Sequence, residues 1–303
     1  MKILTTATHS EGYFTLLKQT SEDWGYQLSV LGWRQPWKGF AWKIELYALE
    51  LKTIAPNEIV ICVDAYDVVV LGPPEEVMSK FLDTHHPIVF SGQRYFPGQS
   101  WMRILADKLM SDSHDNFIRN RINDLYDYSR PCMGLLIGYA GKLAELFDAL
   151  LEIEKEEAIN NDQILLNKYY LKNPGSIFLD SSCTIFQNLW RTGWGLFGKI
   201  NPHNTRCEID IYFDEQYKRK RVRNKKFNTT ACFIHGPFNL DMSLVIKDLD
   251  LKAPPLDLYK SWHYWEYSIM YFLKRGVRFF GRWIFGILLL ILVGFMLIYY
   301  LFG

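Results

Sequence analysis

Short apolar runs alternate along the chain with longer segments in which apolar residues recur every three or four positions. Runs of strand length bounded by turn residues predict buried strands, and the longer spacing predicts amphipathic helices. Strands are predicted at 2–7, 26–32, 58–72, 87–92 and 134–140, and helices at 12–24, 40–54, 74–84 and 141–173. The stretch 58–72 is compatible with one strand or with a strand pair. This alternation predicts an α/β domain with a mainly parallel sheet.

Beyond residue 176 the pattern changes to short strands, which we expect to add to the sheet and complete the same domain. These strands are predicted at 176–182, 207–213, 220–227 and 231–236. The chain contains neither an internal repeat nor a low-complexity linker, so a single domain over 1–255 is the simplest organisation. The run 218–226 has seven basic residues in nine and is expected to be a solvated hairpin; contact with anionic lipid and a nuclear signal are the alternatives.

The C-terminal residues differ from the rest because 283–303 contain no charged residue. A helix of about 20 apolar residues, at about 1.5 Å per residue, spans the roughly 30 Å hydrocarbon core of a bilayer. We therefore predict a transmembrane helix at 282–303, with a buried core helix as the alternative. The preceding segment 256–281 mixes aromatic and charged residues, which favours an amphipathic helix at the lipid headgroups over an ordinary surface helix.

Charges beside the predicted transmembrane helix indicate its orientation. Its flanking basic residues all lie before the charge-free run 283–303, and they are Lys274, Arg275, Arg278 and Arg282. Basic residues near a span tend to stay on the cytoplasmic side. The N-terminus lacks the apolar stretch of about 7–15 residues that a signal peptide needs. We therefore expect a single-pass membrane protein with a C-terminal anchor and its large domain on the cytoplasmic side.

Composition excludes several classes of protein. The 303 residues are 49% hydrophobic and 22% charged, which excludes intrinsic disorder and collagen-like repeats. The formal net charge of +1 provides no overall field toward nucleic acid, and we expect no nucleic-acid partner. Five scattered cysteines without a CxxC pair exclude a disulfide scaffold and a zinc ribbon. The sequence has no GxSxG or P-loop motif, so serine hydrolases and P-loop NTPases have no support.

Two carboxylates lie just after a predicted apolar strand. Residues 59–63 lead into Asp64, and Asp67 comes three positions later. In open parallel sheets, ligands bind at the carboxyl ends of the strands. Two neighbouring carboxylates repel each other, and a divalent cation such as Mg²⁺ or Mn²⁺ between them relieves that repulsion. The pair predicts a metal site, although both residues can also cap a turn.

Two further polar features follow apolar or helical runs. His235 ends the run 232–234 and precedes the turn signal at 236–237, so it can complete a metal site or serve as a structural histidine. The polar segment 160–163 interrupts a helical pattern. It is expected to be either the N-cap of the second helix or a polar edge that binds substrate.

Eight short segments, taken in order, resemble the glycosyltransferase domain of the procollagen-lysine hydroxylases. They are THSEGY (8–13), LGWRQPWKG (31–39), VDAYDVV (63–69), FSGQRYFP (90–97), GLLIGYA (134–140), NDQ (161–163), LDSSCTIFQNL (179–189) and HGP (235–237). The resemblance covers about residues 1–245 and depends on the order of the segments, because none of them is specific alone.

The resemblance implies a GT-A-like, Rossmann-type mixed sheet with flanking helices, and transfer of a hexose with retention of anomeric configuration. The donor would be a UDP-sugar, with glucose or galactose as the sugar. The acceptor would be a hydroxyl on a glycan or on a modified protein side chain. Mn²⁺, with Mg²⁺ as an alternative, would be held on the diphosphate by Asp64, Asp67 and His235.

The resemblance also implies roles for residues around the donor. Tyr66 would stack on uracil, while Thr6 and Thr8 would contact the nucleoside. Trp37 would lie on a loop that covers the donor.

Four more positions correspond to the phosphates and the sugar. Lys43 would lie near the phosphates, where Asn239 stands in place of an expected lysine. Asn161 and Asp162 would face the sugar and the acceptor as the catalytic residues.

This sequence departs from the family pattern at the polar segment, where an amide replaces one carboxylate of an acidic run, and at Cys132-Met133-Gly134, where Asn-Ser-Gly is usual. The lost acidic residue leaves open a catalytically weak nucleotide-sugar-binding scaffold at a membrane. A metal-dependent phosphodiester hydrolase is a further alternative, because it would use the same Asp64, Asp67 and His235.

Overall fold

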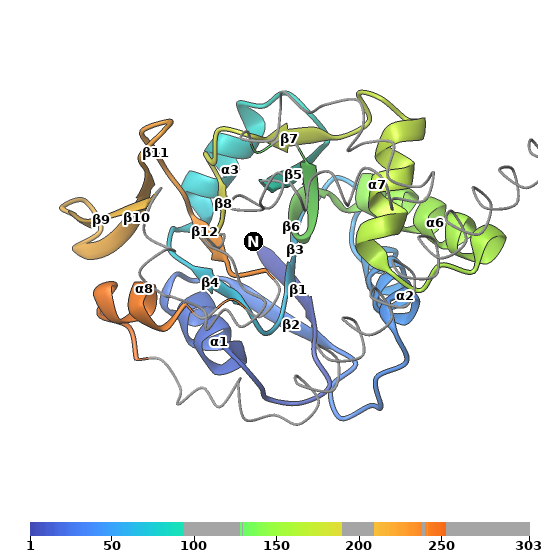
Figure 1. Ribbon diagram of the computed structural model, residues 1–303, viewed down its shortest axis with the longest axis horizontal. Helices are drawn as coiled ribbons and strands as arrows, with labels where there is room; N and C mark the ends of the chain where they lie inside the picture. Colours follow the sequence, from blue (N-terminus) through green and yellow to red (C-terminus); the bar gives the residue numbers. More distant parts are fainter. Residues whose placement is uncertain (94–127, 129, 190–208, 238–239, 241, 253–303) are drawn as a thin grey trace, which may run out of the picture. The chain divides into compact units, whose positions relative to one another are not determined.

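A six-stranded sheet organises the part of the chain that the computed structural model describes, residues 1–93, 128, 130–189, 209–237, 240 and 242–252 (Figure 1). Its strands, in spatial order, are β2 (Gln27–Leu31), β1 (Lys2–Thr6), β3 (Ile59–Asp64), β6 (Arg130–Tyr139), β5 (Ile88–Gln93) and β7 (Phe178–Asp180). Strand β6 runs antiparallel to β3 and β5, and the other pairings in this sheet are parallel. The sheet is therefore mixed and mainly parallel, as predicted for an α/β domain.

Strand β3 at the centre of the sheet is buried on both faces. Val60 and Cys62 pack into the core on one side, whereas Ile61 and Val63 pack into the core on the other. Successive side chains of a strand point to opposite faces, so a strand covered from both sides needs apolar residues at every position. This requirement explains the unbroken apolar run that precedes Asp64.

Three helices cover one face of the sheet (Figure 1). They are α2 (Phe40–Leu51), α6 (Ala140–Glu157) and α7 (Asp162–Lys172). Ile44, Leu143 and Leu165, one from each helix, share a core cluster with the sheet. The predicted break near 159–161 separates α6 from α7, and it begins at Ala158, whose φ of 52° places it in the left-handed region.

Two helices and a second sheet cover the opposite face (Figure 1). The helices are α1 (Phe14–Asp23) and α3 (Pro74–Leu82), and the second sheet has the order β4 (Val68–Val70), β12 (Phe233–His235) and β8 (Phe186–Asn188). Leu17, Val77 and Phe233, from α1, α3 and β12, share one core cluster with Ile61. The stretch 58–72 is thus a strand pair whose two strands belong to different sheets.

A third sheet forms from residues 209–230. Its strands are β9 (Ile209–Asp214), β10 (Arg219–Asn224) and β11 (Thr229–Thr230). The expectation that the late short strands add to the main sheet is therefore correct for β7 and wrong for β9, β10 and β12, while β8 (Phe186–Asn188) and β11 were not predicted. Closing a hairpin over a few residues costs less conformational entropy than pairing with a distant edge, which favours the separate β9–β10 ribbon.

The basic run 218–226 lies in this hairpin, as predicted, but Arg221 is buried rather than solvated. The Arg221 guanidinium donates two hydrogen bonds to Glu76, at 2.7 and 2.8 Å, and lies 3.2 Å from Asp214. Lys80 donates to the same Glu76 carboxylate at 2.6 Å. Burial raises the pKa of Glu76, but the hydrogen bonds from Arg221 and Lys80 outweigh it and lower that pKa to about 2. The cluster ties the hairpin to α3.

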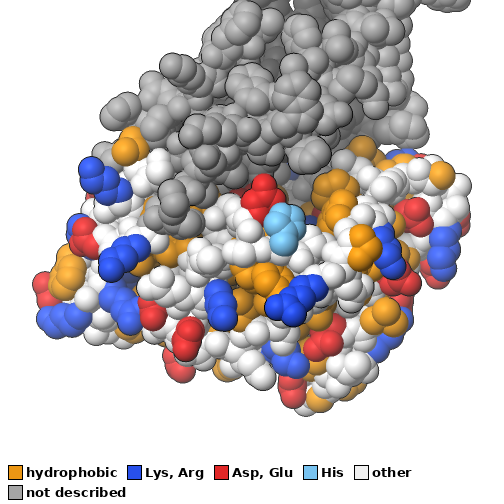
Figure 2. Space-filling view, turned by 90° about the horizontal axis from the view of Figure 1, so that it is seen from below, with side chains coloured by type: hydrophobic (Ala, Val, Ile, Leu, Met, Phe, Trp, Pro, Cys, Tyr) orange, Lys and Arg blue, Asp and Glu red, His pale blue; other side chains and the backbone are white. Residues whose placement is uncertain are grey.

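The two predicted membrane segments, 256–281 and 282–303, lie outside the described residues. Within the described residues, whose last helix is α8 (Ser243–Asp248), no helix is both long and apolar enough to cross a bilayer. Basic and acidic side chains are interspersed on the described face shown in Figure 2, in keeping with the net charge of +1.

Glu76→Gln should lower the free energy of unfolding by about 2 kcal/mol at neutral pH, because the buried Arg221 guanidinium loses the carboxylate that accepts two of its hydrogen bonds and keeps only Asp214. Folding lowers the pKa of Glu76 from 4.5 to about 2, so its contribution is complete above pH 4.5 and is lost as the pH falls toward 2. The difference between the two proteins should therefore shrink between pH 5 and pH 3. Chemical denaturation at each pH measures it.

Glu75→Gln provides the control, because Glu75 lies on the same turn of α3 and is exposed. It should change the free energy of unfolding by less than about 0.5 kcal/mol at either pH. Equal losses in the two variants, or a loss independent of pH, would contradict the assignment to the Arg221–Glu76 ion pair.

Candidate metal centre

The register of the second sheet brings two predicted ligands together. Antiparallel pairing sets His235 of β12 opposite Val68 of β4, the residue that follows Asp67. The backbone N–H of Gly236 donates to the carbonyl of Asp67 at 2.8 Å. The loop that carries Asp67 is therefore fixed against the end of β12, and residues far apart in sequence share one edge of the sheet.

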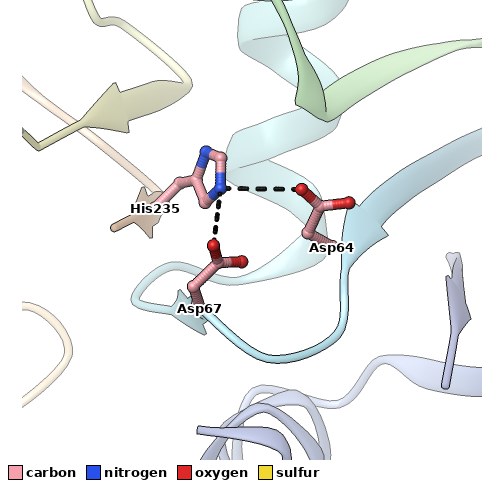
Figure 3. Close-up of side chains that lie close together, drawn as sticks. All are labelled: Asp64, Asp67 and His235. Atoms are coloured by element: carbon pink, nitrogen blue, oxygen red, sulfur yellow. Dashed lines mark ion pairs between the residues drawn. The ribbon is translucent and has the colours of Figure 1, made fainter. Parts of the chain in front are cut away.

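Asp64 completes the group from the end of β3, opposite Thr6 in the parallel pairing of β1 and β3. Nε2 of His235 lies 3.3 Å from Oδ2 of Asp67 and 3.7 Å from Oδ2 of Asp64 (Figure 3). One ligand atom from each residue lies within 4.8 Å of the other two. Two carboxylates and an imidazole are common ligands of divalent cations in proteins, so this group can hold a metal ion.

Two unpaired atoms of the group also fit a cation. Among the described residues, Oδ1 of Asp67 and Nε2 of His235 are buried side-chain atoms without a hydrogen bond, and Nε2 has only its ion-pair contacts with the two carboxylates. A buried polar atom left without a partner costs roughly 1–3 kcal/mol, and coordination of a metal ion removes that cost. Figure 3 shows both carboxylates directed toward the same ring nitrogen. The donor set and the unpaired atoms therefore agree with a metal centre.

Gly134 of β6 lies against this group. A Cβ atom at this position would come 2.2 Å from Cε1 of His235 and 2.8 Å from Oδ2 of Asp64. Contacts this short force a neighbour to move, so a side chain at this position would displace a candidate ligand. Gly134 keeps the glycine of the family pattern and stands at the point of closest approach to the metal group, whereas the departure lies at Cys132 and Met133.

Lys43 of α2 joins the metal group to Asp162. Its side chain is buried, and Nζ donates to Oδ1 of Asp64 at 2.5 Å and to Oδ2 of Asp162 at 2.8 Å. Burial lowers the pKa of Lys43, but the carboxylates of Asp162 and Asp64 raise it well above its usual value. The lysine is therefore a fixed positive charge held by two carboxylates of the site.

The pKa of Asp64 is lowered, whereas the pKa values of Asp67 and His235 are raised. Burial raises the pKa of Asp64, but Lys43 and His235 hold it below its ordinary value. Burial raises the pKa of Asp67, and the attraction of His235 only partly offsets it. Burial lowers the pKa of His235, yet Asp67 raises it well above its usual value. A proton and a divalent cation therefore compete for the same ring nitrogen.

The polar segment 160–163 supplies helix caps. Oδ1 of Asn160 accepts hydrogen bonds from the first two backbone N–H groups of α2, at 2.7 and 3.2 Å. Oδ1 of Asn161 accepts from the N–H of Ile164 at 3.0 Å, which confirms the N-cap interpretation for α7. Asn160, in the break between α6 and α7, thus caps the start of α2, which lies 120 residues earlier in the sequence.

Asp162 is buried and both of its carboxylate oxygens are engaged. Oδ2 accepts from Lys43, and Oδ1 accepts from the backbone N–H of Gln163 at 2.8 Å. The Gln163 side chain in turn accepts from the N–H of Met133 at 3.0 Å and donates to the carbonyl of Pro131 at 2.7 Å. The start of α7 is therefore attached to β6 beside the metal group.

Three residues predicted at the nucleoside lie near the ends of β1 and β3. Thr6 is opposite Asp64 in the strand register. The backbone N–H of Thr8 donates to the hydroxyl of Tyr66 at 3.1 Å, and the Tyr66 ring lies 5.8 Å from that of His9. Thr8 and Tyr66 are thus in direct contact at the edge where the metal group lies.

Trp37 lies on the loop before α2, the helix that carries Lys43. Its side chain is 49% exposed, and its ring meets those of Phe40 and Trp42 edge-on, at 5.5 and 5.7 Å. Asn239 lies outside the described residues.

The family comparison agrees with this geometry. The model of the PLOD GT domain matches residues 1–247, which include every described residue named in the metal group. The chain belongs to this family. Membership of the PLOD GT domain family confirms the resemblance found in the eight sequence segments, and the mixed sheet with flanking helices fits a GT-A-like fold.

Curated relatives of this PLOD GT domain are long proteins. Procollagen-lysine,2-oxoglutarate 5-dioxygenase 1 of Bos taurus is 27% identical over 247 residues, which are 77% of this chain and 29% of the relative. Multifunctional procollagen lysine hydroxylase and glycosyltransferase LH3 of Homo sapiens is 26% identical over 250 residues, with the same coverage of both chains. The chain therefore spans less than a third of the length of these relatives.

The structure brings Asp64, Asp67 and His235 of the PLOD GT domain together, as the sequence predicted, while their role as ligands stays a prediction. Sequence reasoning missed the contacts of Asn160 and Gly134. No local pattern signals them, because each acts on an element far along the chain.

Gly134→Ala should weaken binding of Mn²⁺ at least about tenfold, because the added methyl group displaces His235 or Asp64. Isothermal titration calorimetry of Mn²⁺ into the protein measures this change. Gly138→Ala is the matched control on the same strand, since its Cβ would come 2.7 Å from the carbonyl oxygen of Pro87, away from the metal group. Both variants should lose stability, and equal losses of Mn²⁺ affinity would show that the effect is a general disturbance of β6.

Proposed function

We propose that this chain is a Mn²⁺-dependent glycosyltransferase that moves a hexose, glucose or galactose, from a UDP-sugar to a hydroxyl on a glycan or a modified protein side chain. The observation that carries the proposal is the Asp64–Asp67–His235 group at the strand ends of a PLOD GT domain. The relative LH3 is named as a glycosyltransferase, which supports the same reaction class.

A divalent cation held by these residues would neutralise charge that develops on the diphosphate as the glycosidic bond breaks. Mn²⁺ suits the mixed carboxylate and imidazole donor set, and Mg²⁺ is the alternative. Asp67 and His235 would gain partners for their unpaired atoms when the cation is present. The metal group would therefore set the position of the leaving group.

Lys43 and Asp162 would act as fixed charges beside the leaving group. Lys43 holds one oxygen of Asp162, and a backbone N–H holds the other, so this carboxylate is oriented before substrate arrives. A preoriented negative charge stabilises the positive charge that develops on a sugar ring during transfer. We propose this electrostatic role for Asp162, with retention of configuration, while Asn161 orients α7 as its cap.

Thr6, Thr8 and Tyr66 would receive the nucleoside, with uracil stacked on the Tyr66 ring. Trp37 would close over the donor from the loop before α2, and Asn239 would lie at the phosphates. The contact between Thr8 and Tyr66 supports a common site for these groups, next to the metal group. The exposed ring of Trp37 supports a role at the entrance.

Asp64→Asn, Asp67→Asn and His235→Gln should each lower metal-dependent release of UDP from a UDP-hexose at least about 100-fold, because each removes one ligand of the cation. The assay incubates the full chain with a panel of UDP-sugars, with and without Mn²⁺. Asp148→Asn is a matched control, because Asp148 is an exposed carboxylate paired with Lys52 on the α2–α6 surface. It should leave UDP release unchanged.

The same assay distinguishes the alternative functions. Tight binding of UDP without turnover would contradict transfer and support a nucleotide-sugar-binding scaffold. Cleavage of simple phosphodiesters without a sugar donor would support a metal-dependent hydrolase. UDP release that does not respond to Mn²⁺ would contradict the metal assignment.

We also propose that residues 282–303 anchor the protein in a bilayer with residues 1–255 on the cytoplasmic side and residues 256–281 at the headgroups. The charge-free run 283–303 and the basic residues before it support this proposal. Lipid would then be a partner of the C-terminal segment alone.

Replacing Leu289 and Leu292 together by arginine should move the protein from the alkaline-resistant membrane fraction to the soluble fraction, because charges at the centre of a span cost roughly 2.5–3.5 kcal/mol each. Leu49→Arg with Leu171→Arg is the control, since both leucines are exposed on helices of the folded domain. The control should stay in the membrane fraction. Asn228 lies in a glycosylation sequon, so glycan attachment there would contradict the cytoplasmic orientation.

A further inference from the structure

Asn188 lies beside the metal group without belonging to it. It is the last residue of β8 and stands opposite His235 in the parallel pairing of β8 and β12. Its side chain is 1% exposed. Such a buried amide needs partners for both ends, and the identity of these partners fixes its orientation.

The two hydrogen bonds of Asn188 determine which way the amide faces. Nδ2 lies 2.8 Å from the carbonyl oxygen of Gly92, and Oδ1 lies 2.7 Å from Nδ1 of His235. A carbonyl oxygen can only accept a hydrogen bond, so the NH₂ end must face Gly92 and the oxygen must face His235. The amide oxygen also only accepts, and Nδ1 of His235 must therefore carry a proton.

In the neutral ring, a proton on Nδ1 of His235 leaves a lone pair on Nε2. A neutral imidazole protonated at Nδ1 has its lone pair on Nε2, and Nε2 is the atom that faces Asp64 and Asp67. The other neighbour of Nδ1 is Sγ of Cys132 at 3.7 Å, a much weaker acceptor. Asn188 is thus the strong partner of Nδ1 among the described residues.

We propose that Asn188 is a positioning residue of the metal centre, which fixes the ring orientation and the tautomer of His235 so that Nε2 is presented to a divalent cation. The inference rests on the metal-dependent function proposed above. Hydrogen bonds to the second nitrogen of a ligating histidine typically change metal affinity by 10- to 100-fold when they are removed. Asn188 would act through His235 and would not contact the donor.

Gln187 is a buried amide on the same strand that serves as a structural comparison for Asn188. It precedes Asn188 on β8 and is equally buried, but its side chain bonds to Tyr128, Asn224 and the backbone carbonyl of Asn188 rather than to His235. Its Nε2 donates to the hydroxyl of Tyr128 at 3.0 Å, and its Oε1 accepts from Nδ2 of Asn224 at 2.8 Å. Both amides support the packing of β8, and only Asn188 contacts a candidate ligand.

Asn188→Leu in the full chain should weaken Mn²⁺ binding by about 10- to 100-fold in calorimetry. Gln187→Leu should lower thermal stability to a similar degree and leave Mn²⁺ affinity within about twofold of the unaltered chain. Unchanged affinity in Asn188→Leu, or equal losses in both variants, would overturn the inference. Failure of the unaltered chain to bind Mn²⁺ would instead contradict the metal centre itself.

Asn188→Asp separates affinity from stability. Aspartate keeps an acceptor for the Nδ1 proton of His235 but cannot donate to the carbonyl of Gly92. This variant should therefore lose stability while Mn²⁺ affinity is retained or increased. A loss of affinity as large as that of Asn188→Leu would show that the bond to Gly92, and not the one to His235, matters.

Nuclear magnetic resonance tests the tautomer directly in the unaltered, ¹⁵N-histidine-labelled full chain. The His235→Gln variant serves only to assign the ring, whose resonances are those that disappear while the other histidine resonances stay in place. At a pH where the ring is neutral, Nδ1 should be protonated and Nε2 unprotonated. The opposite tautomer in the unaltered chain would overturn the inference.

Discussion

The register of one three-stranded sheet is the constraint on which the metal group depends. Pairing of β12 with β4 and β8 sets His235 beside Val68 and Asn188, and the backbone bond from Gly236 fixes Asp67 next to it. A slip of one residue in a strand turns its side chains to the opposite face, so the ligand would leave the group altogether. The short strands β12 and β8 thereby connect parts of the chain that local sequence cannot relate.

Charge balance explains how several ionised groups can share so little space. Lys43 is buried, and burying an isolated ammonium group is very costly unless carboxylates surround it. Asp64 and Asp162 provide that compensation, while the lysine keeps Asp64 ionised beside a second carboxylate. The same contacts hold Asp162 in one orientation. The cation expected from the family would therefore enter a site whose charges are already arranged. Oδ1 of Asp67 and Nε2 of His235, which have no hydrogen-bond partner, would bind it.

Much of the fold was predictable because its strands are buried on both faces and its helices have one apolar side. The apolar run before Asp64 and the helical spacing over 40–54 correspond to β3 and α2. The polar break at 160–163 was also located correctly, including the cap by Asn161. The late strands were not, since residues that pair in a local hairpin and residues that join a large sheet have the same short apolar pattern. The burial of Arg221 within a basic run depends on Glu76 of α3, a partner that composition does not reveal.

The sequence alone determined that Asp64 and His235 end apolar runs and that Asp67 follows Asp64 by three positions, since each of these is a local feature. It also determined the family, because that depends on the order of short segments. Only the tertiary structure decided that these three side chains meet, that Lys43 binds two carboxylates, and that Asn188 faces Nδ1 of His235. The physical reason is that strand register and helix packing set distances between residues far apart along the chain, and neither leaves a mark in the residues nearby.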